Sequence, residues 1–142
     1  MKKNIIWIAV IDSHNAKIFQ TSKEEKEVPN LIREIAIKTE PNPEQGRSFD
    51  SLGNGRHAME PHSNFKDVER QHFASEIEKF FHESLNQNKF QNLILISPHK
   101  MLSALEEKLS KQVQQKITHR LHKNISEFSP TEIKTYLTEM GI

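Results

Sequence analysis

The first forty residues alternate between apolar runs and short polar breaks, a pattern that predicts three β-strands. Residues 5–11 are almost entirely apolar and rich in β-branched side chains, which is typical of a strand covered on both faces. The turn-favouring residues "DSHN" at 12–15 separate this strand from a second one at 16–21. Apolar and polar side chains then alternate from Leu31 to Lys38, so we expect a third strand nearer an edge of the sheet.

The middle of the chain has helical periodicity. Residues 65–86 predict the longest helix, with Asn64 as its N-cap and Asp67 in its first turn. Its expected apolar stripe consists of Phe65, Val68, Phe73, Ile77, Phe80 and Phe81. The stretch "NLILISP" then predicts a buried strand, and Pro98 is suited to the first position of the helix that follows it.

The last third predicts one more strand and one more helix. Period-two alternation from Ile117 to His122 indicates a strand, which a right-handed crossover places parallel to the preceding one. "SPTE" at 129–132 is a capping box that begins a terminal helix. The expected fold is therefore α/β, one domain over residues 1–142 with a mixed sheet and flanking helices. Its order is β-β-β-loop-α-β-α-β-α, and the ribonuclease-H-like type is one candidate for it.

The segment 40–64 stands apart because it has no sustained apolar period. It contains three of the four glycines of the chain, together with three prolines. Long loops of this kind are usually functional or disordered. Glycines allow backbone amides to approach a phosphate, and arginines can hold phosphate oxygens in a bidentate manner. The predicted phosphate-binding residues here are Arg47, Gly53, Gly55, Arg56 and His57. A solvated insertion is the alternative, since carboxylates outnumber arginines in this segment.

Composition narrows the function only slightly. The 20 basic and 19 acidic side chains leave a formal charge of +1, so global charge indicates no partner. The absence of cysteine excludes disulfides and thiolate zinc sites. "MKKN" before the first apolar run resembles a signal peptide, but the run of seven residues is short and we interpret it as a core strand. We expect a soluble, cytoplasmic protein without a cofactor and without membrane insertion.

The segment from Pro98 to Lys123 has a local excess of basic residues that offers a second contact surface for nucleic acid. Lys116, Arg120 and Lys123 near the last strand are its candidate phosphate contacts. A simply solvated surface is the better explanation for this basic segment, because Lys100, Lys108 and Lys111 lie on a predicted helix whose other face is buried.

Catalytic chemistry has weaker support. A metal-dependent nuclease of ribonuclease-H-like fold needs several carboxylates around hydrated metal ions, and the candidates are Asp12, Asp50 and Glu69. Asp12 is better explained as a turn-former at the end of the first strand. His119 and His122 point to opposite faces of the predicted strand, so no zinc site is expected.

Five motifs in this order resemble the bacterial host attachment protein family. They are "WIAVIDSHNAKIF", "GRHAMEP", "ERQHFASEI", "NLILISPHKML" and "KNIS". That family is similar in fold to the middle domain of archaeal and eukaryotic peptide-chain release factors, in which a glycine-rich loop before a long helix reaches the peptidyl-transferase centre. The corresponding segment here is Gly53 to His57.

This sequence departs from the release factors at the decisive place. Their loop requires a Gly-Gly-Gln triplet, whereas this chain has "GNGRH" and no glutamine between Leu52 and His62. The resemblance therefore implies a non-catalytic module that binds structured RNA or the ribosome, without inherited peptide release. The alternatives are the metal-dependent nuclease and a protein–protein interaction module, with self-association through the strand at Leu31 to Lys38 as one form of it.

Overall fold

A five-stranded mixed sheet forms the centre of the computed structural model, which describes residues 4–23, 28–37 and 59–142, with side-chain surroundings from residue 66 in the last range. The strand order is β3-β2-β1-β4-β5. Strand β1 pairs antiparallel with β2 and parallel with β4, β2 pairs antiparallel with β3, and β4 pairs parallel with β5. The mixed sheet with flanking helices and the parallel crossover are confirmed. The strands span Ile5–Ile11 (β1), Asn15–Ser22 (β2), Asn30–Ala36 (β3), Asn92–Ile96 (β4) and Ile117–Leu121 (β5).

Strand β1 lies in the middle of the sheet, and residues 7–11 are each at most 2% exposed. Because side chains alternate along a strand, Trp7, Ala9 and Ile11 join one apolar cluster while Ile8 and Val10 join the other. The apolar run is thus a strand covered on both faces, as the pattern predicts.

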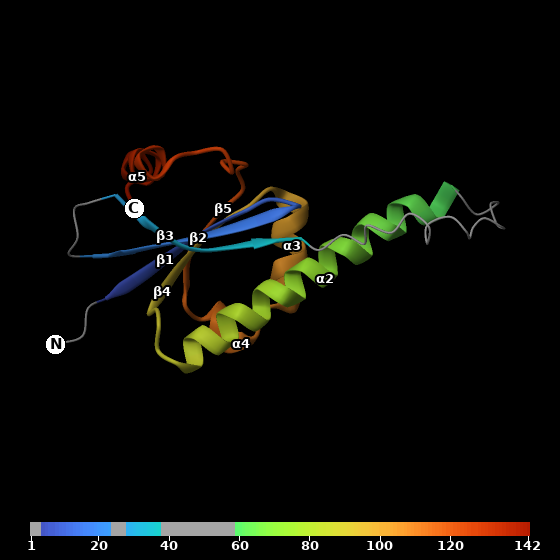
Figure 1. Ribbon diagram of the computed structural model, residues 1–142, viewed down its shortest axis with the longest axis horizontal. Coiled ribbons are helices and arrows are strands. Elements are labelled where there is room, and N and C mark those ends of the chain that lie inside the picture. Colours follow the sequence, from blue (N-terminus) through green and yellow to red (C-terminus); the bar gives the residue numbers. More distant parts are fainter. Residues whose placement is uncertain (1–3, 24–27, 38–58) are drawn as a thin grey trace.

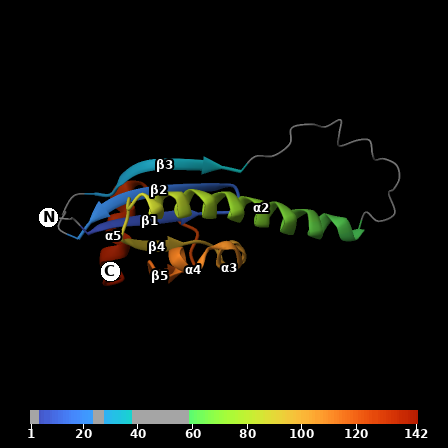
Figure 2. The same ribbon diagram turned by 90° about the horizontal axis from the view of Figure 1, so that it is seen from below.

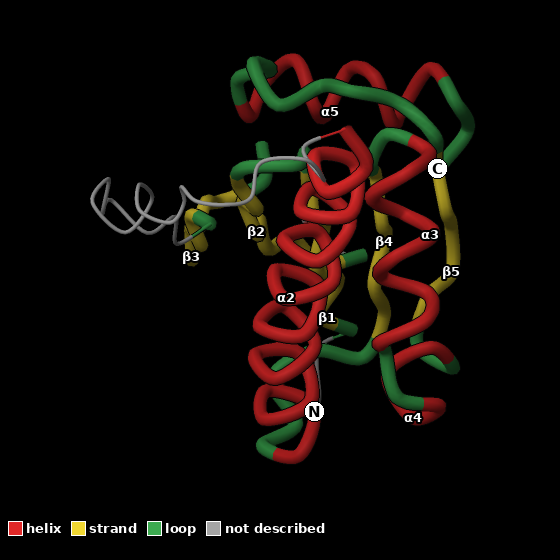
Figure 3. Tube along the Cα trace, turned by 90° about the vertical axis from the view of Figure 1, so that its right-hand side faces the viewer, coloured by secondary structure: helices red, strands yellow, loops and turns green. Residues whose placement is uncertain are grey.

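Three of the described helices cover one face of the sheet, and one covers the other (Figures 1 and 3). Helices α2 (Met59–Asn86), α3 (His99–Lys108) and α4 (Lys111–Gln114) pack on the face of Trp7, and α5 (Pro130–Glu139) packs on the other. The larger core is partly aromatic: the Trp7 ring stacks on Phe80 and Phe90, with centroids 5.5 and 4.6 Å away. This aromatic group fixes α2 against β1.

Helix α2 differs from the prediction at its beginning. It starts at Met59, so residues 59–64 are helical rather than loop, and Asn64 is not the N-cap. Pro61 falls within the first turn, where its missing N–H leaves no helical hydrogen bond unmade. Val68 does not belong to the buried stripe because it is 49% exposed, whereas Phe73 is 1% exposed. The helix meets the sheet only from about Phe73 onwards, and its first half extends beyond the sheet (Figures 1 and 2).

The last two helices, α4 and α5, both begin at a serine N-cap. The predicted capping box is confirmed: Ser129 Oγ accepts from Glu132 N–H at 3.2 Å, and Glu132 Oε1 accepts from Ser129 N–H at 2.8 Å. Helix α4 was not predicted. It is a single turn whose N-cap Ser110 accepts from Val113 N–H and whose Val113 is buried. The observed order therefore has one more short helix between β4 and β5 than we predicted.

Candidate nucleic-acid interface

The carboxyl ends of the three parallel strands lie together at one edge of the sheet. From β1 the chain turns to β2 on one side, and from β4 it passes through α3 and α4 to β5 on the other. The connections that leave the neighbouring parallel strands β1 and β4 therefore run to opposite sides of the sheet. In open α/β sheets ligands bind outside the carboxyl ends of the strands at such a switch point.

Asp12 organises the first of the loops at this edge. Its Oδ1 accepts from the backbone N–H groups of His14 and Asn15, at 2.8 and 2.7 Å, and its own N–H donates to the Asn15 carbonyl at 2.9 Å. Asp12 is thus the turn-former that the sequence predicts. The turn leaves Ser13 and His14 exposed at the edge.

Two histidines and two lysines lie just after the ends of β4 and β5. His99 follows β4 and His122 follows β5, and their rings meet edge to face with centroids 5.4 Å apart. Both are exposed, as are Lys100 and Lys123 beside them. These four residues, together with the turn at residues 12–15, are called the carboxyl edge below.

The start of α3 adds a set of backbone donors to the carboxyl edge. Its N-cap is Pro98, which provides no side-chain cap, and the first turn has no acidic residue. The first N–H groups of a helix carry a partial positive charge and commonly bind phosphate. Lys100 belongs to this same turn, so the carboxyl edge combines helix-end donors with an exposed ammonium group.

The projecting half of α2 extends from the sheet on the same side as the carboxyl edge, since β1 and β4 both end toward it (Figures 1 and 2). No residue from 66 to 72 is buried. The Asp67 carboxylate and Arg70 guanidinium on this half form an ion pair at 2.7 Å. The projecting half of α2 is thus an exposed helix on the same side of the sheet as the two lysines of the carboxyl edge.

The predicted loop residues are not part of this described surface. Arg47, Gly53, Gly55, Arg56 and His57, and also Asp50, lie outside the described residues. Their contact with phosphate stays a prediction.

The three predicted contacts near the last strand do not form one surface. Lys116 precedes β5 and Lys123 follows it, so they lie at opposite ends of the strand, roughly 20 Å apart at the rise of an extended chain. The Arg120 Nε is paired with Glu106 Oε2 at 2.7 Å. Of the three, Lys123 belongs to the carboxyl edge.

The carboxylates proposed for a nuclease are not assembled within the part of the chain that the structure describes. Asp12 is engaged in its own turn, and Glu69 lies on the projecting half of α2. Residues 4–23, 28–37 and 59–142 contain no group of three or more His, Cys, Asp or Glu side chains arranged to hold a metal ion. They also contain no helix long and apolar enough to span a bilayer.

The His99–His122 pair is a feature that the sequence pattern did not predict. The pattern relates His122 to His119 on one strand, but β5 ends at Leu121 and His122 lies beyond it. A signal was present, because each histidine comes shortly after one of two strands predicted to be parallel neighbours. Such strands end at the same edge of a sheet.

Comparison with solved structures shows that the chain has a release-factor-like α/β fold. An archaeal translation termination factor, aRF1, matches with a TM-score of 0.51 and 10% identity over 97% of this chain and 39% of that protein. S. cerevisiae Dom34, described as a translation termination-like factor involved in RNA quality control pathways and interacting with Hbs1, has a TM-score of 0.49 and 15% identity over 95% of this chain and 33% of its own. The chain thus spans about two fifths of the first of these proteins and a third of the second.

The sequence profile of a family described as "Protein required for attachment to host cells" matches residues 7–137. The chain belongs to this family, as its motifs indicate. No curated protein matches the chain.

Proposed function

We propose that the protein is a non-catalytic module that binds structured RNA, with the ribosome as its setting. One observation carries the proposal: in a chain with a release-factor-like fold, the projecting half of α2 and the carboxyl edge lie on the same side of the sheet. The family description concerns attachment to host cells. Under this proposal the contribution to attachment is indirect, through the synthesis of other proteins.

The chemistry of the carboxyl edge supports a phosphate partner. Lys100, Lys123 and the first N–H groups of α3 favour negative charge, and the paired rings of His99 and His122 offer polar donors and flat surfaces. Two carboxylates of the described residues lie at the edge: Asp12 Oδ1 already accepts two backbone hydrogen bonds, and Glu34 Oε2 accepts from Asn15 Nδ2 at 2.7 Å. The sequence "GNGRH" before α2 lacks the glutamine of the release-factor triplet, so we do not propose peptide release.

The direct test is a titration of the full chain with ribosomal RNA and with intact ribosomes at several salt concentrations. Binding through phosphate contacts releases counterions, so the affinity is expected to fall linearly on a log–log plot against salt. Arg56→Gln in the loop is expected to weaken binding while the unfolding midpoint stays unchanged. An affinity independent of salt, or no binding to either RNA, overturns the proposal.

A second candidate function, self-association, is favoured by strand β3. This strand lies at the edge of the sheet and, among the described strands, pairs only with β2. Leu31 and Ile32 are 45% and 38% exposed, so an apolar edge strand faces outward. Light scattering during size-exclusion chromatography tests it: Leu31→Lys converts a dimer to a monomer if β3 pairs with a second copy. A monomeric parent chain at high concentration excludes it.

A further inference from the structure

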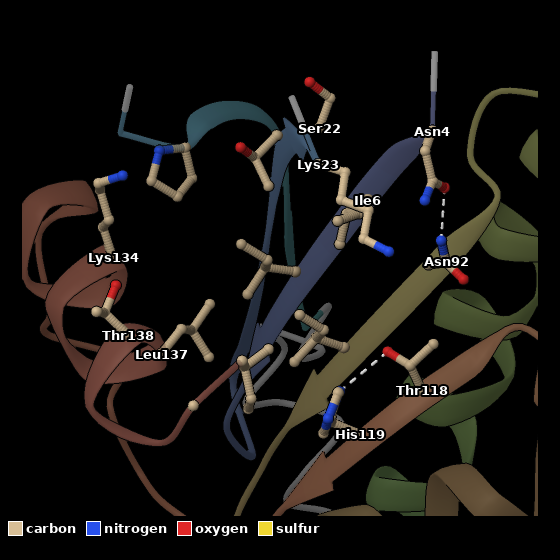
Figure 4. Close-up of a pocket in the computed structure, with 16 residues that line it drawn as sticks. Asn4, Ile6, Ser22, Lys23, Asn92, Thr118, His119, Lys134, Leu137 and Thr138 are labelled. Atoms are coloured by element: carbon tan, nitrogen blue, oxygen red, sulfur yellow. Dashed lines mark hydrogen bonds between the residues drawn. The ribbon is translucent and has the colours of Figure 1, made fainter. Parts of the chain in front are cut away.

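A cavity of about 450 Å³ lies between α5 and the sheet, at the end of the parallel strands opposite to the carboxyl edge (Figure 4). Strands β1, β4 and β5 all begin there, while α5 covers only part of this face. The cavity is large enough for a small organic molecule, since such sites occupy roughly 300–1,000 Å³. It does not depend on the proposed RNA-binding function.

The floor of the cavity is aliphatic. Ile6 and Ile8 from β1 and Ile94 from β4 point away from the face of Trp7, and Leu137 of α5 approaches them from the other side. Ile8 and Ile94 are at most 4% exposed and close the base of the cavity, whereas Ile6 is partly exposed. A ligand seated on it would bury an apolar body there.

One wall of the cavity is a connected polar group. Asn92 Nδ2 donates to Asn4 Oδ1 at 2.6 Å, and the backbone N–H of Lys23 donates to the Asn4 carbonyl at 3.3 Å. Lys23 is thereby held beside the two amides, as Figure 4 shows. Within the described part of the chain, its ammonium group forms no ion pair or hydrogen bond.

The ionisable side chains that line the cavity, among the residues that the structure describes, are lysine and histidine. Lys23, Lys134 and His119 line it, and no described aspartate or glutamate does. Lys23 and the adjacent amide pair, beside an aliphatic floor, complement a molecule that combines an apolar body with one anionic group.

We propose that this cavity is a binding site for a small amphipathic anion, with its aliphatic body on Ile6, Ile8, Ile94 and Leu137 and its anionic group at Lys23 and the Asn4 amide. Octanoate is a suitable probe because it has both parts. Acetate has the charged group alone, and 1-octanol has the apolar body alone.

The experiment follows backbone amide signals of the ¹⁵N-labelled full chain during titration with each probe. Octanoate is expected to shift the signals of Thr21, Lys23, Asn92 and Thr138 saturably. Acetate and 1-octanol are expected to bind at least about tenfold more weakly, because each lacks one of the two interactions. Octanoate shifts that do not saturate, or that map elsewhere, overturn the proposal, and so does equal affinity for octanoate and octanol.

Two pairs of variants locate the site. Lys23→Gln is expected to weaken octanoate binding roughly tenfold, whereas Lys111→Gln, an exposed lysine outside the cavity, leaves it unchanged. Thr138→Trp fills the mouth and blocks binding, whereas Thr135→Trp, on the same helix but not in the lining, does not. Equal effects within either pair contradict the assignment. RNA binding by Lys23→Gln is expected to match the parent, so failure here is separable from failure of the proposed function.

Discussion

The rings of His99 and His122 meet edge to face at 5.4 Å, although one follows β4 and the other follows β5. Their contact exists because β4 and β5 are parallel neighbours and end at the same edge of the sheet. Lys100 and Lys123 come next in the chain after each histidine and are exposed. The pairing of two strands therefore brings four polar residues from two segments to one place.

Reversing charge at the carboxyl edge tests the RNA-binding proposal. The double variant Lys100→Glu with Lys123→Glu is expected to weaken binding to ribosomal RNA. On a plot of log affinity against log salt concentration, the slope should become shallower by roughly two. This is about one for each phosphate that a lysine no longer neutralises. Filter binding at several salt concentrations measures both quantities.

The control for this variant is Lys111→Glu, which changes an exposed lysine at the start of α4, at the other end of the crossover. It alters the net charge in the same direction without touching the carboxyl edge. If its effect per charge equals that of the double variant, binding depends on overall charge and the proposed surface is wrong.

Asp12 is expected to act through hydrogen bonds of its own turn. Replacement by alanine removes the acceptor of two backbone N–H groups and should lower the free energy of unfolding by about 1–2 kcal/mol. Asp12→Asn keeps an oxygen at the same position and should be less destabilising. Urea unfolding followed by circular dichroism gives both values.

The same pair of Asp12 variants examines the nuclease alternative. RNA cleavage in the presence of Mg²⁺ that disappears in Asp12→Asn while the stability is retained would support a catalytic carboxylate. Equal destabilisation by asparagine and alanine would instead contradict the turn-forming role.

The second half of α2 is expected to contribute far more to stability than the first. Phe81→Ala empties a fully buried position beside Trp7 and Phe90, and should cost about 3–5 kcal/mol. Val68→Ala lies on the projecting half, where Val68 is 49% exposed, and should change stability by less than about 0.5 kcal/mol. Chemical denaturation compares the two. A large destabilisation in Val68→Ala would mean that the projecting half packs against another part of the protein.

The capping box of α5 provides a local test. Ser129→Ala removes the acceptor for Glu132 N–H and should reduce stability by about 1 kcal/mol. Thr131→Ala, an exposed change in the same turn, is the matched control and should be close to neutral. Similar destabilisation in both would show that helix propensity, and not the cap, determines the effect.

Local patterns were sufficient for most individual elements. The apolar run at residues 5–11 predicts β1 because a strand buried on both faces has apolar side chains at successive positions and not only at every second one. Ser129 and Glu132 predict the start of α5 because their hydrogen bonds connect residues three apart. Such signals lie within a few residues, so the sequence displays them directly.

Two local predictions were wrong for a physical reason. Val68 comes three residues after Phe65, and this local spacing predicts that it lies on the apolar stripe together with Phe73. The strands of the sheet, however, do not reach as far as Val68. A side chain is buried only where another element covers it, and Val68 is 49% exposed. The start of α2 at Met59 was not predicted because Pro61 and the polar residues after it lack an apolar period.

The amino-acid sequence by itself determined most of the strands and helices, the cap of α5 and the turn at Asp12, since these depend on contacts between near neighbours in the chain. Tertiary structure alone decided that His99 meets His122, that Arg120 is paired with Glu106, and that Lys116 and Lys123 lie far apart. It also decided that Lys23, Asn92 and Leu137 surround one cavity. These relationships follow from strand order and helix placement, which depend on burial of the whole core and not on contacts between near neighbours in the chain.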